Sequence, residues 1–247
     1  MTEFRPGRFE ILPVIIKNLL IINGLFYLAQ ITFPESPTAS FSLEDLFALH
    51  AWQSKLFQPW QMITHMFLHG DFGHILGNMF ALWMFGSVLE NVWGPKRFLL
   101  FYILCGVGAS VLHLLILSYE FVPMASDLMQ LSQMSVSGSS DFNQAVLAYS
   151  KAHNIQLTRI LSENNVSLDT PGIRTEIMEL LTNNYNKTLN TATLGASGAV
   201  FGIIMAFVYL FPNTYIYIYF FFPIKAKWLG ILYFSYELFF AVRNTAG

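Results

Sequence analysis

Gly195-Ala196-Ser197-Gly198 places a serine between glycines at the start of an apolar stretch long enough to cross a membrane. A second apolar stretch upstream carries His74 and Asn78, which are four residues apart and so share one face of a helix. Polar groups at bilayer depth are costly, so each needs a structural or chemical reason. A serine can attack a carbonyl, and an imidazole and a carboxamide can donate hydrogen bonds to the oxyanion that forms. If the two stretches pack together, these residues predict nucleophilic catalysis within a membrane.

The glycines near Ser197 also permit a purely structural interpretation. Gly198 and Gly202 form a small-residue motif of the kind that packs membrane helices, and the serine could hydrogen-bond across such an interface. Together with Gly195 they leave one edge of the helix nearly flat. We expect this edge to allow close contact with the helix that carries His74. On these residues alone, packing and catalysis both remain open.

Three histidines could instead bind a metal ion, since His65 and His69 are four residues apart, just before the stretch that contains His74. Neither is followed by the glutamate of the metalloprotease pattern, and Asp71 is the only carboxylate nearby. We therefore expect no metal and no cofactor. The three imidazoles, with the amide of Asn78, are instead predicted hydrogen-bond donors for an anionic oxygen.

The composition is that of a membrane protein. Of the 247 residues, 54% are hydrophobic and 11% are charged, with a mean hydropathy of +0.49, whereas soluble domains carry about a quarter charged residues. The formal net charge of −2 gives no indication of a nucleic-acid partner. We expect an all-α polytopic membrane protein in contact with the lipid bilayer. The apolar stretches predict five spans, at about 11–33, 72–92, 98–118, 192–211 and 226–242.

Basic residues predict the orientation of these spans. Arg5, Arg8 and Lys17 lie near the N-terminus, and Lys96 and Arg97 lie between the second and third spans. Placing these segments on the cytoplasmic side puts the N-terminus inside. The start of the fourth span, with its serine in the first two turns, then lies toward the outside. We take a bacterial plasma membrane as the location.

Residues 119–190 differ from the rest of the chain because they are rich in Ser, Asn, Gln and Thr. We expect a polar, extracytoplasmic insertion between the third and fourth spans, with part of 124–141 disordered. One helix is predicted within 142–161. Another is expected to open at Thr170-Pro171, which has the pattern of an N-cap followed by a first-turn proline.

Two other connections carry local signals. Ser42 and Asp45 form a capping box that predicts short helices within 34–60, lying at the membrane interface. Isoleucine alternates with tyrosine after Pro212 and a second proline follows, which is typical of a strand within 212–225. We place this second connection at the inner interface.

The chain resembles the rhomboid intramembrane serine proteases in two motifs, HGDFGHILGN at 69–78 and GASG at 195–198. The resemblance covers most of the chain, roughly 55–118 and 191–242. The coincidence of several motifs in the appropriate spans is far more specific than any one of them. Further matches are Trp60, Glu90, Gly94-Pro95-Lys96 and Phe211-Pro212-Asn213.

The resemblance implies a rhomboid-like helical bundle, with residues 1–247 forming one membrane domain that contains the 119–190 insertion. It implies that Ser197 is the nucleophile and that His74 and Asn78, with the backbone at Ser197, stabilise the oxyanion. It also implies that the partners are protein substrates with transmembrane helices, cut at or near the outer membrane face. It assigns no substrate-binding residues here.

The chain departs from the family pattern in three places. Gln61 follows Trp60 where the family often has an arginine, and 119–190 replaces what is often a short loop. The family's general base is a histidine in a sixth span, within Ala-His-x-x-Gly, whereas this chain stops at Gly247, after the fifth predicted span. A serine is a poor nucleophile without an adjacent base. We therefore expect a C-terminally truncated rhomboid with five of six spans, inactive as a 247-residue chain; the alternative is a non-catalytic relative that binds transmembrane helices.

Overall fold

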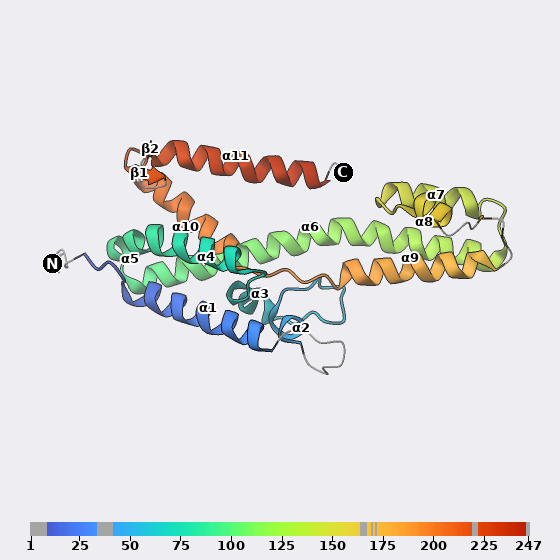
Figure 1. Ribbon diagram of the computed structural model, residues 1–247, viewed down its shortest axis with the longest axis horizontal. Coiled ribbons are helices and arrows are strands. Elements are labelled where there is room, and N and C mark those ends of the chain that lie inside the picture. The colour runs from blue at the N-terminus through green and yellow to red at the C-terminus, as the bar shows by residue number, and fades with distance from the viewer. Residues whose placement is uncertain are drawn as a thin grey trace. The chain divides into compact units, whose positions relative to one another are not determined.

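The computed structural model describes residues 9–33, 42–163, 167–168, 170, 172–218 and 222–245 (Figure 1). The chain forms two compact units. Arg5 and Arg8, on which the predicted orientation partly depends, and Pro171 lie outside the described residues. Unit 1 comprises the chain up to Leu49, Gln58–Leu112 and the part from Ala192 onward, and unit 2 comprises His50–Phe57 and His113–Thr191.

Unit 1 is almost entirely helical. The predicted capping box is present, because the side chain of Ser42 accepts a hydrogen bond from the backbone N–H of Asp45 at the start of α2 (Leu43–Phe47). The elements of unit 1 are α1 (Val14–Thr32), α2 (Leu43–Phe47), α3 (Gln61–Thr64), the 3₁₀ turn η1 (His65–Phe67), α4 (Phe72–Ala81), the π-helical turn η2 (Leu82–Gly86), α5 (Ser87–Trp93), the first part of α6 (Pro95–Ser137), α10 (Ser197–Leu210), β1 (Tyr215–Ile218), β2 (Phe222–Lys225) and α11 (Ala226–Thr245).

A small β-hairpin departs from the predicted all-α fold. Strands β1 and β2 pair in antiparallel register, with Tyr215 opposite Lys225 and Ile218 opposite Phe222. The strand predicted after Pro212 is therefore confirmed as β1. Within the described part of the chain, the other β pairing is an isolated bridge between Leu49 and Thr193.

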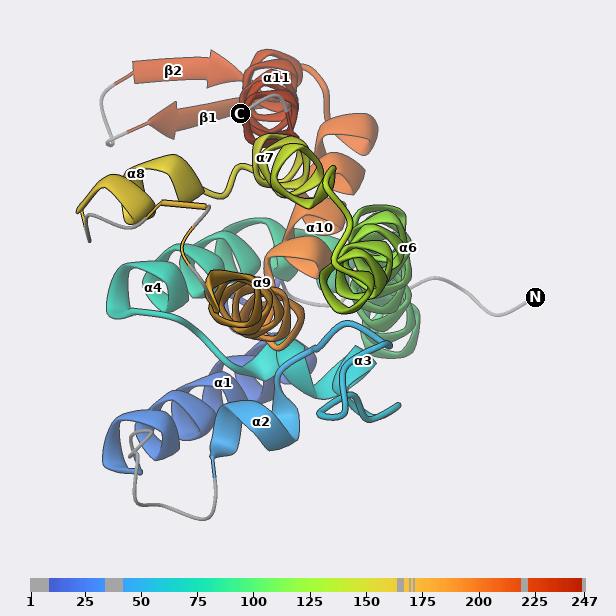
Figure 2. The ribbon, with the colours of Figure 1, turned by 90° about the vertical axis from the view of Figure 1, so that its right-hand side faces the viewer.

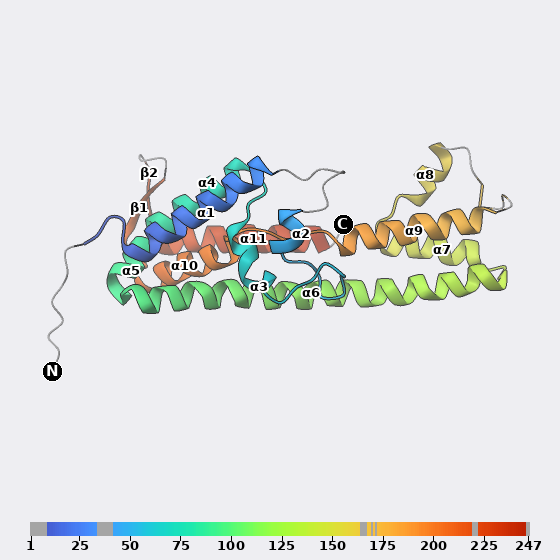
Figure 3. The ribbon, with the colours of Figure 1, turned by 90° about the horizontal axis from the view of Figure 1, so that it is seen from below.

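The core of unit 1 surrounds the continuous rod formed by α4, η2 and α5. Both α1 and α10 pack against this rod, and α10 lies between α4 and the first part of α6 (Figures 2 and 3). Phe98 and Tyr102 of α6 are fully buried, together with Ile16, Leu82 and Ile203 from the neighbouring elements. Near its N-terminal end the rod carries His74, which is partly exposed, and Asn78, which is buried.

The start of α1 is capped from a distant part of the chain. Pro13 precedes the helix and provides no side-chain cap, so the first amides of α1 need another acceptor. Glu90 of α5, which is only 3% exposed, accepts the amides of Ile15 and Ile16 at 2.9 Å each. The helix dipole favours a carboxylate at this end. Glu90, one of the residues that carry the resemblance, therefore fixes α1 to α5.

Three helical segments in the described ranges are long and apolar enough to cross a membrane: α1, the rod Phe72–Trp93, and α6. They correspond to the first three predicted spans, although α6 continues unbroken to Ser137, well beyond the expected end at 118. The shorter apolar helix α10 begins at Ser197, so the predicted start of the fourth span at Ala192 was wrong. The helix starts later than predicted because the segment before Ser197 is held in an extended conformation by backbone hydrogen bonds.

Unit 2 has a hydrophobic core of its own. Met124, Leu128 and Leu131 follow one another at helical spacing along α6 and are buried, so α6 remains helical and the disorder predicted within 124–141 was wrong. In place of the single helix predicted within 142–161 there are two, α7 (Phe142–Ala152) and α8 (Leu157–Glu163), with a turn between them in which Asn154 has a φ of +53°. The last helix of unit 2, α9 (Ile173–Leu189), begins after Gly172, whose φ is +84°. It lies where a helix was expected after Thr170, while the predicted first residue, Pro171, is outside the described residues.

Candidate active site

Backbone hydrogen bonds hold the segment before α10 in an extended conformation. Leu49 and Thr193 exchange two hydrogen bonds of 2.8 Å each, and the amide of Gly195 donates to the carbonyl of His65 at 2.9 Å. A helix that began at Ala192 would break these bonds. Ser197 is therefore the first residue of α10, and its side chain is exposed at that end of the helix.

Asp71 and Gly70 position the imidazole of His74. The side chain of Asp71 accepts the backbone N–H of His74 at 2.8 Å and so caps α4. The Nδ1 atom of His74 accepts a long hydrogen bond, 3.5 Å, from the amide of Gly70. A neutral imidazole that accepts through Nδ1 carries its proton on Nε2. In this arrangement Nε2 is therefore a hydrogen-bond donor.

Gly195 allows the side chains of His74 and Ser197 to lie close to the same point. Its φ is +125°, a conformation suited to glycine. A Cβ atom on Gly195 would lie 2.8 Å from Nε2 of His74 and 3.8 Å from Oγ of Ser197. The ring nitrogen and the hydroxyl thus face the same small volume, which exists because residue 195 has no side chain.

Asn78 lies one turn beyond His74 on the same face of α4, the helix that packs against α10. The residue is 8% exposed, and its amide nitrogen is buried without a hydrogen-bond partner among the described residues. Buried polar groups in folded proteins are rarely left unpaired. An unused donor one turn from His74 suits a group that receives a new acceptor during a reaction.

His69 is packed beside His74 and is 1% exposed. The centroids of the two rings are 5.1 Å apart, in an edge-to-face arrangement. Burial, together with the proximity of His74, lowers the pKa of His69 to about 4, so its ring is neutral at physiological pH. The side chain of Gln30 on α1 holds the backbone of His69 through two hydrogen bonds, at 3.0 and 3.1 Å.

The lowered pKa of His69 predicts a pH dependence of stability. Its pKa is about 4 in the folded protein, against the ordinary histidine value of 6.5 that applies to the unfolded chain. The unfolded state therefore binds more protons between these values, and the free energy of unfolding should fall as the pH drops through this window. His69→Gln should flatten that fall. Thermal unfolding of both proteins in one detergent, from neutral pH down to the lower pKa, measures it; parallel curves would contradict this expectation.

His65 has a structural role, and its expected role as a donor to an anionic oxygen was wrong. Its Nδ1 lies 2.8 Å from the carbonyl oxygen of Gln61, and its Nε2 lies 3.4 Å from Oγ of Ser110 on α6. Both ring nitrogens therefore face other partners, while the carbonyl oxygen of His65 holds Gly195. Gln61, at the position of the family's frequent arginine, is fully buried and donates to the carbonyl of Asp45.

The glycine edge of α10 faces α6, and not the helix that carries His74 as expected. A Cβ atom on Gly198 would lie 2.5 Å from Cβ of Ala109, and one on Gly202 would lie 2.5 Å from Sγ of Cys105. Small residues on both helices allow this close approach. Packing thus explains Gly198 and Gly202, while Gly195 alone makes room for His74.

A hollow of about 290 Å³ opens beside Ser197. Within the described ranges it is lined by Ala109 of α6, by Ser197, Gly198 and Phe201 of α10, and by Tyr233 of α11. None of these residues is a histidine or carries a carboxylate. The hollow therefore supplies space next to the hydroxyl without supplying a strong base.

The sequence reasoning missed two residues of this region, Gln30 and Tyr233. Gln30 had a detectable signal, because a polar side chain within an apolar span needs a partner. Tyr233 had none, since tyrosine is common near the ends of membrane helices. Only the packing of α11 shows that Tyr233 lies beside the serine.

The rhomboid domain family matches residues 56–168 and 170–246, which is well over half of the chain. The chain therefore belongs to the rhomboid family, whose characterised members are intramembrane serine proteases, and it is an integral membrane protein with several helices of membrane-spanning character.

Curated relatives include plant and bacterial proteins. RHOMBOID-like protein 12, mitochondrial, of Arabidopsis thaliana is 26% identical over 170 residues, 69% of this chain and 35% of that protein. Rhomboid protease GluP of Bacillus subtilis is 30% identical over 121 residues, 48% of this chain and 20% of that protein. Rhomboid protease AarA of Providencia stuartii is 26% identical over 145 residues, 58% of this chain and 51% of that protein. The chain thus spans between a fifth and about half of the length of these relatives.

Proposed function

We propose that this chain carries the nucleophile and the oxyanion-binding groups of an intramembrane serine endopeptidase. Ser197 is the nucleophile. The oxyanion is stabilised by Nε2 of His74, the side-chain amide of Asn78 and the backbone N–H of Ser197. The observation that supports this best is the volume left open by Gly195, which both Nε2 of His74 and Oγ of Ser197 face.

In this proposal, Oγ of Ser197 attacks the carbonyl carbon of the scissile peptide bond while a general base takes its proton. The carbonyl oxygen becomes an oxyanion within reach of the donors on α4. When this intermediate collapses, the C–N bond breaks, the amine leaves with the proton, and the acyl group stays on Ser197. Water then hydrolyses the ester. Fixed donors are most effective in a water-poor site, which is where a membrane helix places them.

The general base acts from the hollow beside Ser197 in this proposal. Its small walls, Ala109 and Gly198, and its aromatic walls, Phe201 and Tyr233, leave room for an imidazole next to the hydroxyl. In the family, the base is a histidine in a sixth span that packs against the serine helix. We propose that the hollow receives such a histidine, with its ring against the aromatic walls.

Proteins with transmembrane helices are the proposed substrates. Because short basic segments are retained in the cytoplasm, the N-terminus is placed inside and the start of α10 near the outer face of a bacterial plasma membrane. Cleavage would then occur near the outer face. Residues 119–190 are proposed to form an extracytoplasmic insertion within one membrane domain.

A fluorophosphonate probe tests the proposal directly. The folded protein with the proposed histidine seated in the hollow should be labelled in its membrane, and peptide mass spectrometry should place the adduct on Ser197. Heat-denatured protein is the control, because the reactivity of the serine depends on the assembled site. A folded protein that remains unlabelled would overturn the enzymatic proposal and favour a non-catalytic protein that binds transmembrane helices.

A further inference from the structure

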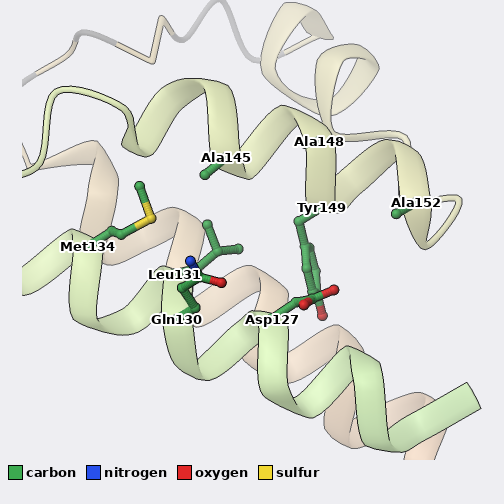
Figure 4. Close-up of a pocket in the computed structure, with 8 residues that line it drawn as sticks. All are labelled: Asp127, Gln130, Leu131, Met134, Ala145, Ala148, Tyr149 and Ala152. Atoms are coloured by element: carbon green, nitrogen blue, oxygen red, sulfur yellow. The ribbon is translucent and has the colours of Figure 1, made fainter.

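We propose that unit 2 binds a basic side chain of a polypeptide partner in a hollow between α6 and α7. The hollow has a volume of about 270 Å³. Asp127 and Gln130 stand on its α6 side with two apolar residues, and Tyr149 stands on its α7 side with three alanines (Figure 4). These residues belong to neither the proposed catalytic machinery nor the helix packing around it.

Tyr149 provides the strongest sign that the hollow takes a ligand. The residue is 4% exposed, and its hydroxyl is buried without a hydrogen-bond partner among the described residues. Its ring reaches from α7 toward Asp127 on α6 (Figure 4). Burial, with smaller contributions from Asp127 and Tyr185, raises the pKa of Tyr149 to about 12, so the hydroxyl stays neutral. A buried hydroxyl without a partner is costly, and an occupant with a hydrogen-bonding group would remove that cost.

The chemistry of the walls favours a cation on an apolar stem. Asp127 supplies a negative charge. The ring of Tyr149 lies with its centroid 4.5 Å from that of the imidazole of His153, and a guanidinium could lie against the tyrosine ring in place of that imidazole. Leu131 and Met134 line the apolar part, while the alanines of α7 leave its volume free. This volume is far larger than one water requires and slightly smaller than pockets for drug-sized ligands. A single long side chain therefore fits best, and an arginine matches both the charge and the ring.

The surroundings are electrostatically suited to such a partner. From Glu120 to Asn190 the chain has seven acidic and four basic residues, so the segment attracts cations. His153 Nε2 lies 3.4 Å from the carboxylate of Asp127, and Arg174 lies over the ring of Phe142. An arriving guanidinium would replace the imidazole next to Asp127. If the proposed function is correct, on which this choice of partner rests, the arginine belongs to the extramembrane part of a substrate.

Methyl NMR of the full chain in detergent micelles tests the site without any cleavage. Met134 lines the hollow, and Met134→Leu identifies its ¹³C-methyl resonance by removing it. The probes are n-butylguanidinium, the peptide acetyl-Ala-Ala-Arg-Ala-Ala-amide, and n-butylurea as the neutral analogue. We expect a saturable shift of this resonance with the first two and at least tenfold weaker binding of the urea.

Matched variants assign the contacts. Asp127→Asn should weaken guanidinium binding at least tenfold, and Tyr149→Phe, which keeps the ring, should weaken it severalfold. Glu179→Gln removes an exposed acidic group outside the hollow and should leave the affinity unchanged.

Three results would overturn the proposal: an unshifted Met134 signal, equal binding of the urea, or full affinity in Asp127→Asn. Binding of n-butylguanidinium but not of the peptide would overturn the polypeptide partner. Because the signal does not depend on Ser197, a failure here is distinguishable from a failure of the proposed protease activity, which probe labelling reports.

Discussion

Ser197→Ala is expected to lower the cleavage of a transmembrane reporter substrate by about 10⁴- to 10⁶-fold, the size of effect seen when a serine nucleophile is removed from a serine protease. Oγ of Ser197 lies at the first position of α10, beside the volume that Nε2 of His74 also faces. Alanine preserves the helix start and the neighbouring hollow but leaves no atom to attack the carbonyl carbon. The loss should therefore fall on kcat, with KM nearly unchanged.

Full-length protein in proteoliposomes with a fluorescent reporter substrate measures this loss. Ser87→Ala is the control, because Ser87 is a helical serine of unit 1 that, unlike Ser197, is buried, and its hydroxyl has no hydrogen-bond partner in the described part of the chain. This control should keep nearly full activity. A Ser197→Ala protein that retained more than about 1% of the wild-type rate would show that the nucleophile lies elsewhere.

Local patterns in the sequence were enough to single out the residues that we propose for catalysis. The four-residue spacing of His74 and Asn78 places them on one helical face. Burying polar side chains in a membrane costs free energy, which makes both residues candidates for a functional role. The structure brings this face of α4 to α10, near Ser197. The strand after Pro212 and the cap at Ser42 were also predictable. In each case the residues that form the pattern lie within a few positions of one another in the sequence.

Long-range contacts decided the features that the sequence did not reveal. The start of α10 depends on the carbonyl of His65 and the backbone of Leu49, which are far away in the chain. The glycines of α10 show that one edge is flat, but not that Ala109 and Cys105 will cover it. In 124–141, the polar composition concealed a buried apolar stripe, because its partners come from α7 and α9.

Gly195→Ala is expected to reduce fluorophosphonate labelling of Ser197 by about 100-fold or more, although the chemical groups all remain. The new Cβ atom would lie 2.7 Å from Cε1 and 2.8 Å from Nε2 of His74, closer than real contacts allow. The φ of +125° adds strain of about 1–3 kcal/mol for a residue with a side chain. Either the imidazole or the segment before Ser197 must move, and a displacement of about 1 Å can cost about 100-fold in rate.

Two controls separate the displacement from the strain. Gly94 also has a positive φ, +81°, but a Cβ there would meet nothing within 4 Å, so Gly94→Ala should lower the unfolding temperature without lowering the labelling rate. In a His74→Ala background the contact with Gly195→Ala disappears, and the second substitution should then cost only the backbone strain. Equal destabilisation by Gly195→Ala in both backgrounds would contradict the contact with His74. Coupling between the two substitutions, measured by thermal unfolding as a double-mutant cycle, would instead show that residue 195 is a glycine because the imidazole lies too close to it to admit a side chain.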